Sequence, residues 1–116
     1  MHQNWYIAEL LEEFRSENQL TSLLHINWIL VRANNAEEAY SKSIEFGQDL
    51  NRAYRNTEDI LVTVTFRGLR DLNIIHEPLE DGAEILFEEI EEMSNNEIKS
   101  MIASKNDLSA FKPPNI

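Results

Sequence analysis

Cysteine is absent from this chain of 116 residues, and glycine and proline occur only three times each. Without a thiol the protein has no disulfide framework, no thiolate metal site and no cysteine nucleophile. Neither a P-loop nor a dinucleotide-binding glycine pattern is present, and no serine stands in a glycine elbow. These absences argue against an enzyme of the common nucleotide-binding or nucleophilic classes, and the sequence predicts no cofactor.

Basic residues are scarce, because 10 Lys and Arg stand against 21 Asp and Glu and give a formal net charge of −11. A field of that sign repels phosphate backbones and anionic lipid, so we expect neither nucleic acid nor a membrane as partner. No apolar run approaches the ~18 residues of a membrane span, and residues 1–4 lack the basic start of a secretory signal. We therefore expect a cytoplasmic protein whose charge admits a basic protein as partner.

Apolar residues make up 42% of the chain, enough for one buried core. Two-residue alternation and β-branched or aromatic residues predict four strands, over residues 5–14, 23–33, 60–76 and 83–93. An N-cap at Asn34-Asn35 predicts a helix over 36–46 that ends near Gly47. The pair Ser94 and Glu97 forms a capping box that starts a second, short helix, with Ile98, Met101 and Ile102 expected to point inward. We predict an α+β fold in the order β-β-α-β-β-α, with a mostly antiparallel sheet of four to five strands and two helices packed on one face.

The predicted domain covers residues 5–104 and is followed by a C-terminal tail over 105–116. The first two strands are expected to pair as a hairpin, and the polar stretch 48–59 is typical of a mobile loop. Alternation divides the second strand into two faces. One face is uniformly apolar, with Leu24, Ile26, Trp28 and Leu30; the other is mixed, with His25, Asn27, Ile29 and Val31. The mixed face indicates partial cover or an interface.

A strand continued from Ile60 to His76 would exceed the usual ~3–10 residues. Gly68 is therefore expected to interrupt it. The glycine can form a bulge that bends one long strand, or a tight turn between two strands. We favour the bent strand.

Four separated stretches of the chain follow a common pattern: Trp5 to Leu10, Ile29 to Ala33, Glu37 to Tyr40 with Lys42, and Phe66 to Leu72. In order and spacing they resemble an uncharacterised bacterial family, domain of unknown function 4288, over about residues 5–90. The resemblance implies a small bacterial cytoplasmic α+β domain. The family carries no established activity, so the resemblance transfers no catalytic residue.

The segment around Gly68 concentrates unusual side chains in an acidic protein. The candidate binding residues are Arg67, Arg70, Asp71, Asn73, His76 and Glu77. Two guanidiniums beside a bent strand suit bidentate binding of a carboxylate or phosphate, and His76 suits acid–base chemistry near neutral pH. On uninterrupted alternation Arg70 shares a face with Leu72 and His76, and Arg67 joins it only if Gly68 shifts the register. The competing interpretation is structural, with both arginines paired to nearby acids.

A metal site at the same segment is not predicted. Its ligands would come from His76, Glu77, Glu80, Asp81 and Glu84, with His25. No metal-ligand spacing such as H-E-x-x-H occurs, and neighbours on a strand point to opposite faces.

The aromatic residues exceed what a sheet covered on one side can bury: Trp5, Tyr6, Trp28, Phe66 and Phe87. The leading hypothesis is therefore a non-enzymatic interaction module that forms a homodimer, most often about a two-fold axis. One alternative is an enzyme or small-molecule binder that uses Arg67, Arg70 and His76 in a shallow pocket. Another is an acidic inhibitor or immunity-type protein, with Glu88 to Glu92 facing a basic partner.

Overall fold

The computed structural model describes residues 3–113, and the chain divides into two compact units, one ending at Leu86 and one beginning at Phe87. The first unit holds β1 (Asn4–Ser16), β2 (Leu23–Ala33), α1 (Ala36–Gln48), β3 (Arg52–Arg55) and β4 (Leu61–Ile75). The second holds α2 (Asn95–Met101) and two 3₁₀ turns, Lys105–Asp107 and Ser109–Phe111. The predicted α+β class and the order β-β-α-β-β-α are confirmed.

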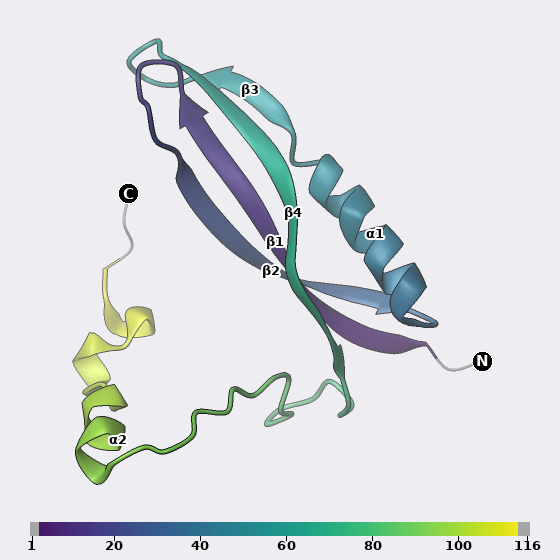
Figure 1. The fold of residues 1–116 in the computed structure, drawn as a ribbon, viewed down its shortest axis with the longest axis vertical. Helices are drawn as coiled ribbons and strands as arrows, with labels where there is room; N and C mark the ends of the chain where they lie inside the picture. Colours follow the sequence, from purple (N-terminus) through teal and green to yellow (C-terminus); the bar gives the residue numbers. More distant parts are fainter. Residues whose placement is uncertain (1–2, 114–116) are drawn as a thin grey trace. The chain divides into compact units, whose positions relative to one another are not determined.

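The four strands form one antiparallel sheet in the order β2-β1-β4-β3 (Figure 1). The central strand β1 therefore pairs on both sides, whereas β2 and β3 are edges. The predicted hairpin of the first two strands is confirmed, with Ala8 of β1 opposite Ile29 of β2.

Two strand predictions were wrong. Residues 83–93 contain no strand, because a run with four glutamates between 88 and 92 would crowd like charges along an exposed ladder. The stretch predicted as a mobile loop contains β3, which is exposed along its length and exists through its pairing with β4. The turn that joins them is closed by Asn56, whose side-chain oxygen accepts hydrogen bonds from the backbone of Glu58 and Ile60.

Helix α1 packs on one face of the sheet, as predicted, and begins at the expected N-cap, where Asn35 Oδ1 accepts from the Glu38 N–H at 2.8 Å. The core at this contact is formed by Tyr6, Ala8, Leu10, Val31, Ala33 and Ala39. Gly47 was expected to end the helix but lies inside it. A Cβ there would lie 2.4 Å from the ring of Phe66, so Gly47 permits close approach of helix and sheet.

The opposite face of the sheet, here called the open face, carries Trp5, Ile7, Glu9, Leu11 and Glu13 of β1 and Leu24, Ile26, Trp28 and Leu30 of β2, as the register places them. The mixed face of β2 is the one under the helix, and it is covered in part: Val31 and Ala33 are buried and His25 is exposed. The uniformly apolar face of β2 is left open.

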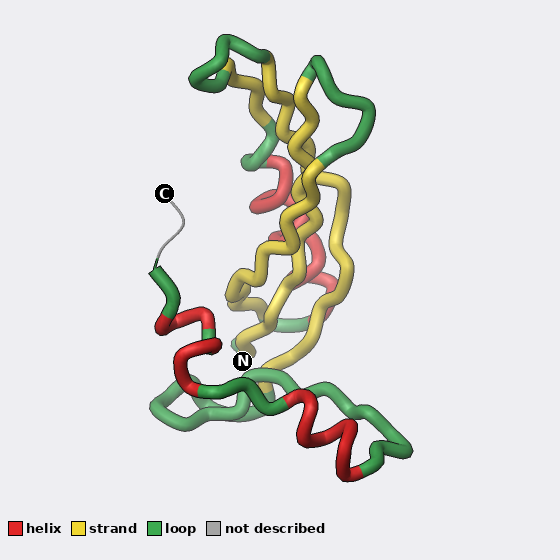
Figure 2. The backbone as a smooth tube through the Cα atoms, turned by 90° about the vertical axis from the view of Figure 1, so that its left-hand side faces the viewer, coloured by secondary structure: helices red, strands yellow, loops and turns green. Residues whose placement is uncertain are grey.

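Over residues 87–113 the second unit contains a helix and turns and no strand, as the colours in Figure 2 show. The predicted capping box of α2 is confirmed, with Ser94 and Glu97 each bonding the other's backbone N–H. Ile98, Met101 and Ile102 were expected to point inward, yet each is at least half exposed and no residue of α2 is buried. The predicted domain limits, 5–104 with a tail over 105–116, stay a prediction.

Candidate functional site

Strand β4 bends at two successive bulges around Gly68. The pairing with β1 shifts register twice and leaves Arg70 and Arg67 as the extra residues. Gly68 lies between them at φ +134°, a backbone conformation that side-chain-bearing residues rarely adopt. The strand remains continuous from Leu61 to Ile75, so the prediction of one bent strand is confirmed.

The bulges change where the arginines point. Alternation had placed Arg70 with Leu72, which packs toward α1, and that placement was wrong. Arg70 instead binds Glu9 of the open face, with its Nε 2.6 Å from Glu9 Oε1 and its Nη2 on the same oxygen. Arg67 Nη1 lies 2.8 Å from Oε1 of Glu13, on the same face. Both arginines therefore bind carboxylates of β1.

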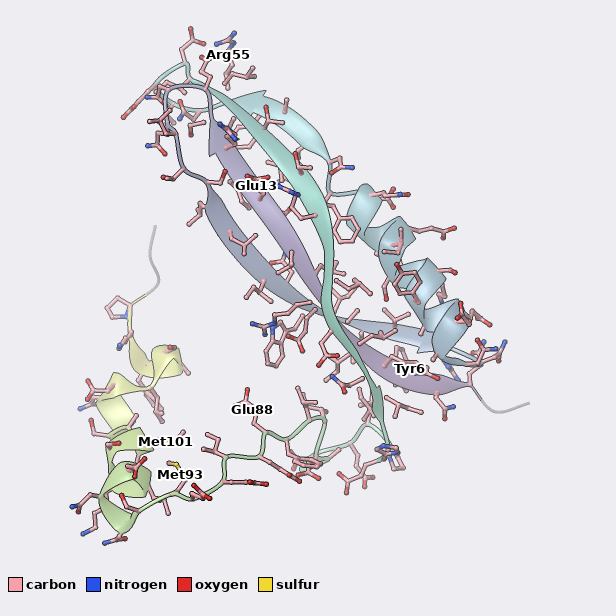
Figure 3. The ribbon with its side chains drawn as sticks, in the orientation of Figure 1. Tyr6, Glu13, Arg55, Glu88, Met93 and Met101 are labelled. Carbon is pink, nitrogen blue, oxygen red and sulfur yellow. The ribbon has the colours of Figure 1, made fainter. Side chains whose placement is uncertain are left out.

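Glu9 is 4% exposed, an unusual position for a carboxylate. Removing a charge from water costs several kcal/mol unless a partner compensates, and Arg70 supplies that partner. Glu13, labelled in Figure 3, is half-buried and accepts hydrogen bonds from the Ser22 hydroxyl and from Arg67. These two bonds, that of Ser22 first, lower the pKa of Glu13 below its ordinary value.

The other candidate residues separate into two groups. Asp71 and Asn73 lie on the open face opposite Glu9 and Ile7, and Asn73 Nδ2 donates to Asp71 Oδ2 at 3.0 Å. This bond, followed by the backbone N–H of Leu72, lowers the pKa of Asp71.

His76 and Glu77 follow the end of β4 and are exposed. The Glu77 carboxylate accepts from the backbone of Glu84. The structure thus gathers Arg67, Arg70, Asp71 and Asn73 on one face and leaves His76 and Glu77 outside that group. Within residues 3–113 no group of three or more histidine and acidic side chains is arranged to hold a metal ion, and no helix there is long and apolar enough to cross a membrane.

An apolar row lies beside these ion pairs on the edge strand β2. Its members are Leu24, Ile26, Trp28 and Leu30, each between 38% and 53% exposed. In the four-stranded sheet β2 pairs only with β1, so its outer backbone groups are also unpaired within the sheet. A hollow of about 190 Å³ adjoins the row, between Trp28 and Leu30 and the later residues Leu79 and Ile85.

A second polar network occupies the helix-covered face, and sequence reasoning missed it. Glu12, 5% exposed, accepts from Asn27 Nδ2 at 2.9 Å and from Arg52 Nη1 at 3.2 Å. His25 Nδ1 lies 4.0 Å from the same carboxylate. The available signal was alternation, because Glu12 stands in line with Tyr6, Ala8 and Leu10 on the inward face of β1.

Helix length explains this network. Both α1 and β1 have 13 residues, but a helix of that length spans about 20 Å and a strand about 43 Å. The helix therefore cannot cover the whole sheet, and Glu12 lies beyond Gly47, where α1 makes its closest approach to Phe66. An open pocket of about 420 Å³ forms beside it, lined by Leu10, Asn27, Ile29, Leu30, Phe46 and Leu50.

Comparison with known proteins adds one match. The family model described as "Domain of unknown function (DUF4288)" matches residues 5–87, which include α1, β2, β3, β4 and all of β1 except its first residue. No curated protein and no solved structure matches the chain significantly.

Proposed function

The chain belongs to the family of domain of unknown function 4288, and we propose that it is a non-enzymatic interaction module that forms a homodimer through the open face of its sheet. One observation carries the proposal: the apolar row Leu24, Ile26, Trp28 and Leu30 is exposed on an edge strand. Contiguous exposed apolar side chains on a sheet face are typical of protein interfaces.

A second copy of this chain is the occupant that the row suits best. A two-fold axis that passes between Ile26 and Trp28 packs the row antiparallel against the same row of the second copy. Each apolar side chain then contacts an apolar side chain of the partner. The ion pairs of Glu9 and Glu13 lie on the neighbouring strand and are already neutralised by Arg70 and Arg67. Copies that pack on this face therefore desolvate Glu9 and Glu13 as compensated charges.

The arginines support this role better than they support catalysis. Their guanidiniums are bound to Glu13 and Glu9, whereas a substrate site needs donors free for the substrate. His76 follows the strand end and lies outside the group formed by the arginines. A pocket formed by Arg67, Arg70 and His76 would depend on guanidiniums whose charges already compensate Glu13 and Glu9.

The test is sedimentation velocity on the full chain and two variants matched in exposure. Trp28 is 53% exposed on the open face and Tyr40 is 52% exposed on α1. We expect the wild type and Tyr40→Glu to sediment as dimers and Trp28→Glu as a monomer with the far-UV circular dichroism spectrum of the folded wild type. A monomeric wild type, or a Trp28→Glu variant that remains dimeric, contradicts the proposal.

An acidic surface for a basic protein is the second candidate. The observation in its favour is that Glu88, Glu89, Glu91 and Glu92 are all exposed. Replacing these four by glutamine is expected to abolish salt-sensitive binding to a cationic protein and to leave the dimer intact. Binding that survives this replacement contradicts the second candidate and does not affect the homodimer proposal.

A further inference from the structure

The pocket beyond the end of α1 has the size and composition of a small-molecule site. Its volume of about 420 Å³ falls in the ~300–1,000 Å³ range typical of ligand pockets. Leu10, Ile29, Phe46 and Leu50 supply apolar walls from β1, β2, α1 and the connection that follows α1. Asn27 is the polar residue that lines it.

A buried carboxylate stands directly behind that asparagine. Glu12 holds Asn27 Nδ2 at 2.9 Å, and its second oxygen holds Arg52 Nη1 at 3.2 Å. Arg52 Nη1 also donates to the carbonyl of Leu50, another lining residue, at 2.9 Å. The network therefore connects two walls of the pocket.

The fold itself does not need a carboxylate at this position. Glu12 continues the inward row of Tyr6, Ala8 and Leu10, where an apolar side chain fills the same space without desolvating a charge. Replacing buried ion pairs by apolar residues is often neutral or stabilising, so stability alone does not account for a carboxylate at this position. Its position behind the lining residue Asn27 indicates a use in binding.

The polar atoms at this end of the pocket are acceptors. A carboxylate offers about four lone-pair positions, and Asn27 and Arg52 account for one each. Because the Asn27 side-chain nitrogen donates a hydrogen bond to Glu12, the Asn27 amide oxygen is the atom that can accept a hydrogen bond from a ligand. A pocket with apolar walls and hydrogen-bond acceptors at one end suits a ligand with an N–H donor group on an apolar body. The net charge of −11 favours a ligand whose donor group is cationic.

We propose that this pocket binds a small apolar amine, with the ammonium group on the amide oxygen of Asn27, beside the buried Glu12 carboxylate, and the hydrocarbon against Phe46, Ile29 and Leu50. The pocket lies at the β2 edge of the helix-covered side, and Leu30 is the lining residue that it shares with the apolar row. Amine binding at Asn27 does not rest on the proposed dimer.

The experiment is a titration of the ¹⁵N-labelled full chain with 2-phenylethylamine, followed by heteronuclear NMR. The matched probe is 3-phenylpropionate, which keeps the ring and reverses the charge. We expect saturable shifts confined to the pocket residues with the amine and at least tenfold weaker binding of the acid. Equal or tighter binding of the acid means that Arg52 governs the site and overturns the proposal, as does the absence of saturable binding by the amine.

Two variants locate the site. Glu12→Gln keeps the shape and removes the charge, and we expect at least tenfold weaker amine binding, because hydrogen bonds to charged groups are the stronger ones. Leu50→Trp fills the pocket with Glu12 intact and tests the site if Glu12→Gln does not fold. Tyr54→Ala, on exposed β3, is the control and is expected to bind as the wild type does. Unchanged amine binding by Leu50→Trp overturns the proposal.

Discussion

Glu9 and Glu12 stand three residues apart on the same strand, are almost equally buried, and face opposite sides of the sheet. Glu9 is held by one arginine that a bulge in β4 delivers. Glu12 is held by Asn27 and Arg52, with His25 nearby, from both edge strands. Two carboxylates of nearly equal burial therefore differ in how many partners stabilise them. Glu9 depends on a single arginine, whereas Glu12 has several donors.

The strongest test of that difference is Arg70→Ala. Glu9 would then keep its burial and lose its cationic partner, which typically costs 3–5 kcal/mol. We expect a loss of about 3 kcal/mol in the free energy of unfolding, at the low end because Arg70 is 48% exposed. Urea unfolding measures it. A double variant, Glu9→Gln with Arg70→Ala, is expected to regain part of the loss, and failure to regain any would mean that Arg70 matters through packing.

Gly68→Ala tests whether the bulges are what bring Arg70 to Glu9. A Cβ at this position meets nothing within 4 Å, so the cost is backbone strain alone. We expect about 2 kcal/mol of destabilisation, as for residues forced into sparsely populated conformations. A variant as stable as the wild type would show that the strand adopts another register at no cost, and the Arg70–Glu9 cross-peaks in NMR spectra would then disappear.

Arg52→Ala makes the matched change at Glu12, and its effect is expected to be smaller. Asn27 still donates to the carboxylate, and His25 can approach from 4.0 Å. We expect about 1 kcal/mol of destabilisation by urea unfolding, the scale of one net hydrogen bond. A loss equal to that of Arg70→Ala would remove the distinction between the two sites.

The smallest effect concerns Glu13 and pH. Its pKa is lowered in the folded state by Ser22 and Arg67, so the stability it contributes is present above its ordinary value of 4.5 and is lost as pH falls through the lower, folded value. We expect Arg67→Ala to flatten the fall of the melting temperature below about pH 4.5 and to leave the slope near pH 7 unchanged. An identical acid profile in the variant would show that Ser22 alone sets this pKa.

The sequence was informative wherever local pattern and burial agree. Alternation placed β2 at Leu23–Ala33, as observed. The N-cap and the acidic first turn placed the start of α1, and the predicted end of α1 lies two residues before the observed end. Gly68 marked the bend in β4, because glycine alone tolerates that backbone freely.

Other features depended on partners far along the chain. Strand β3 is four exposed residues with no periodicity to detect, and its pairing with β4 is what makes it a strand. Strand β4 has two bulges where one was predicted, and the one at Arg70 turns that side chain to the open face. Gly68 marks only one irregularity in the sequence, so the second bulge could not be predicted from it. The burial of Glu9 and Glu12 was not predicted, because carboxylates rarely lie inside proteins and their partners come from other strands. The homodimer and the binding role of the residues around Gly68 stay predictions.

The contact between Gly47 and the ring of Phe66 has a consequence for how the chain reaches this fold. The two residues are 19 positions apart, whereas the pairing of Glu12 with Phe66 spans 54 positions. Closing the shorter loop costs less chain entropy, so we expect docking of α1 on β4 to precede the long-range pairing with β1. Phe66 immediately precedes the first bulge residue, Arg67. Once its ring lies against Gly47, a slip of β4 by one residue would drive Arg67 into the helix. In that order of events, contact with α1 fixes the register of β4 before β4 pairs with the central strand β1.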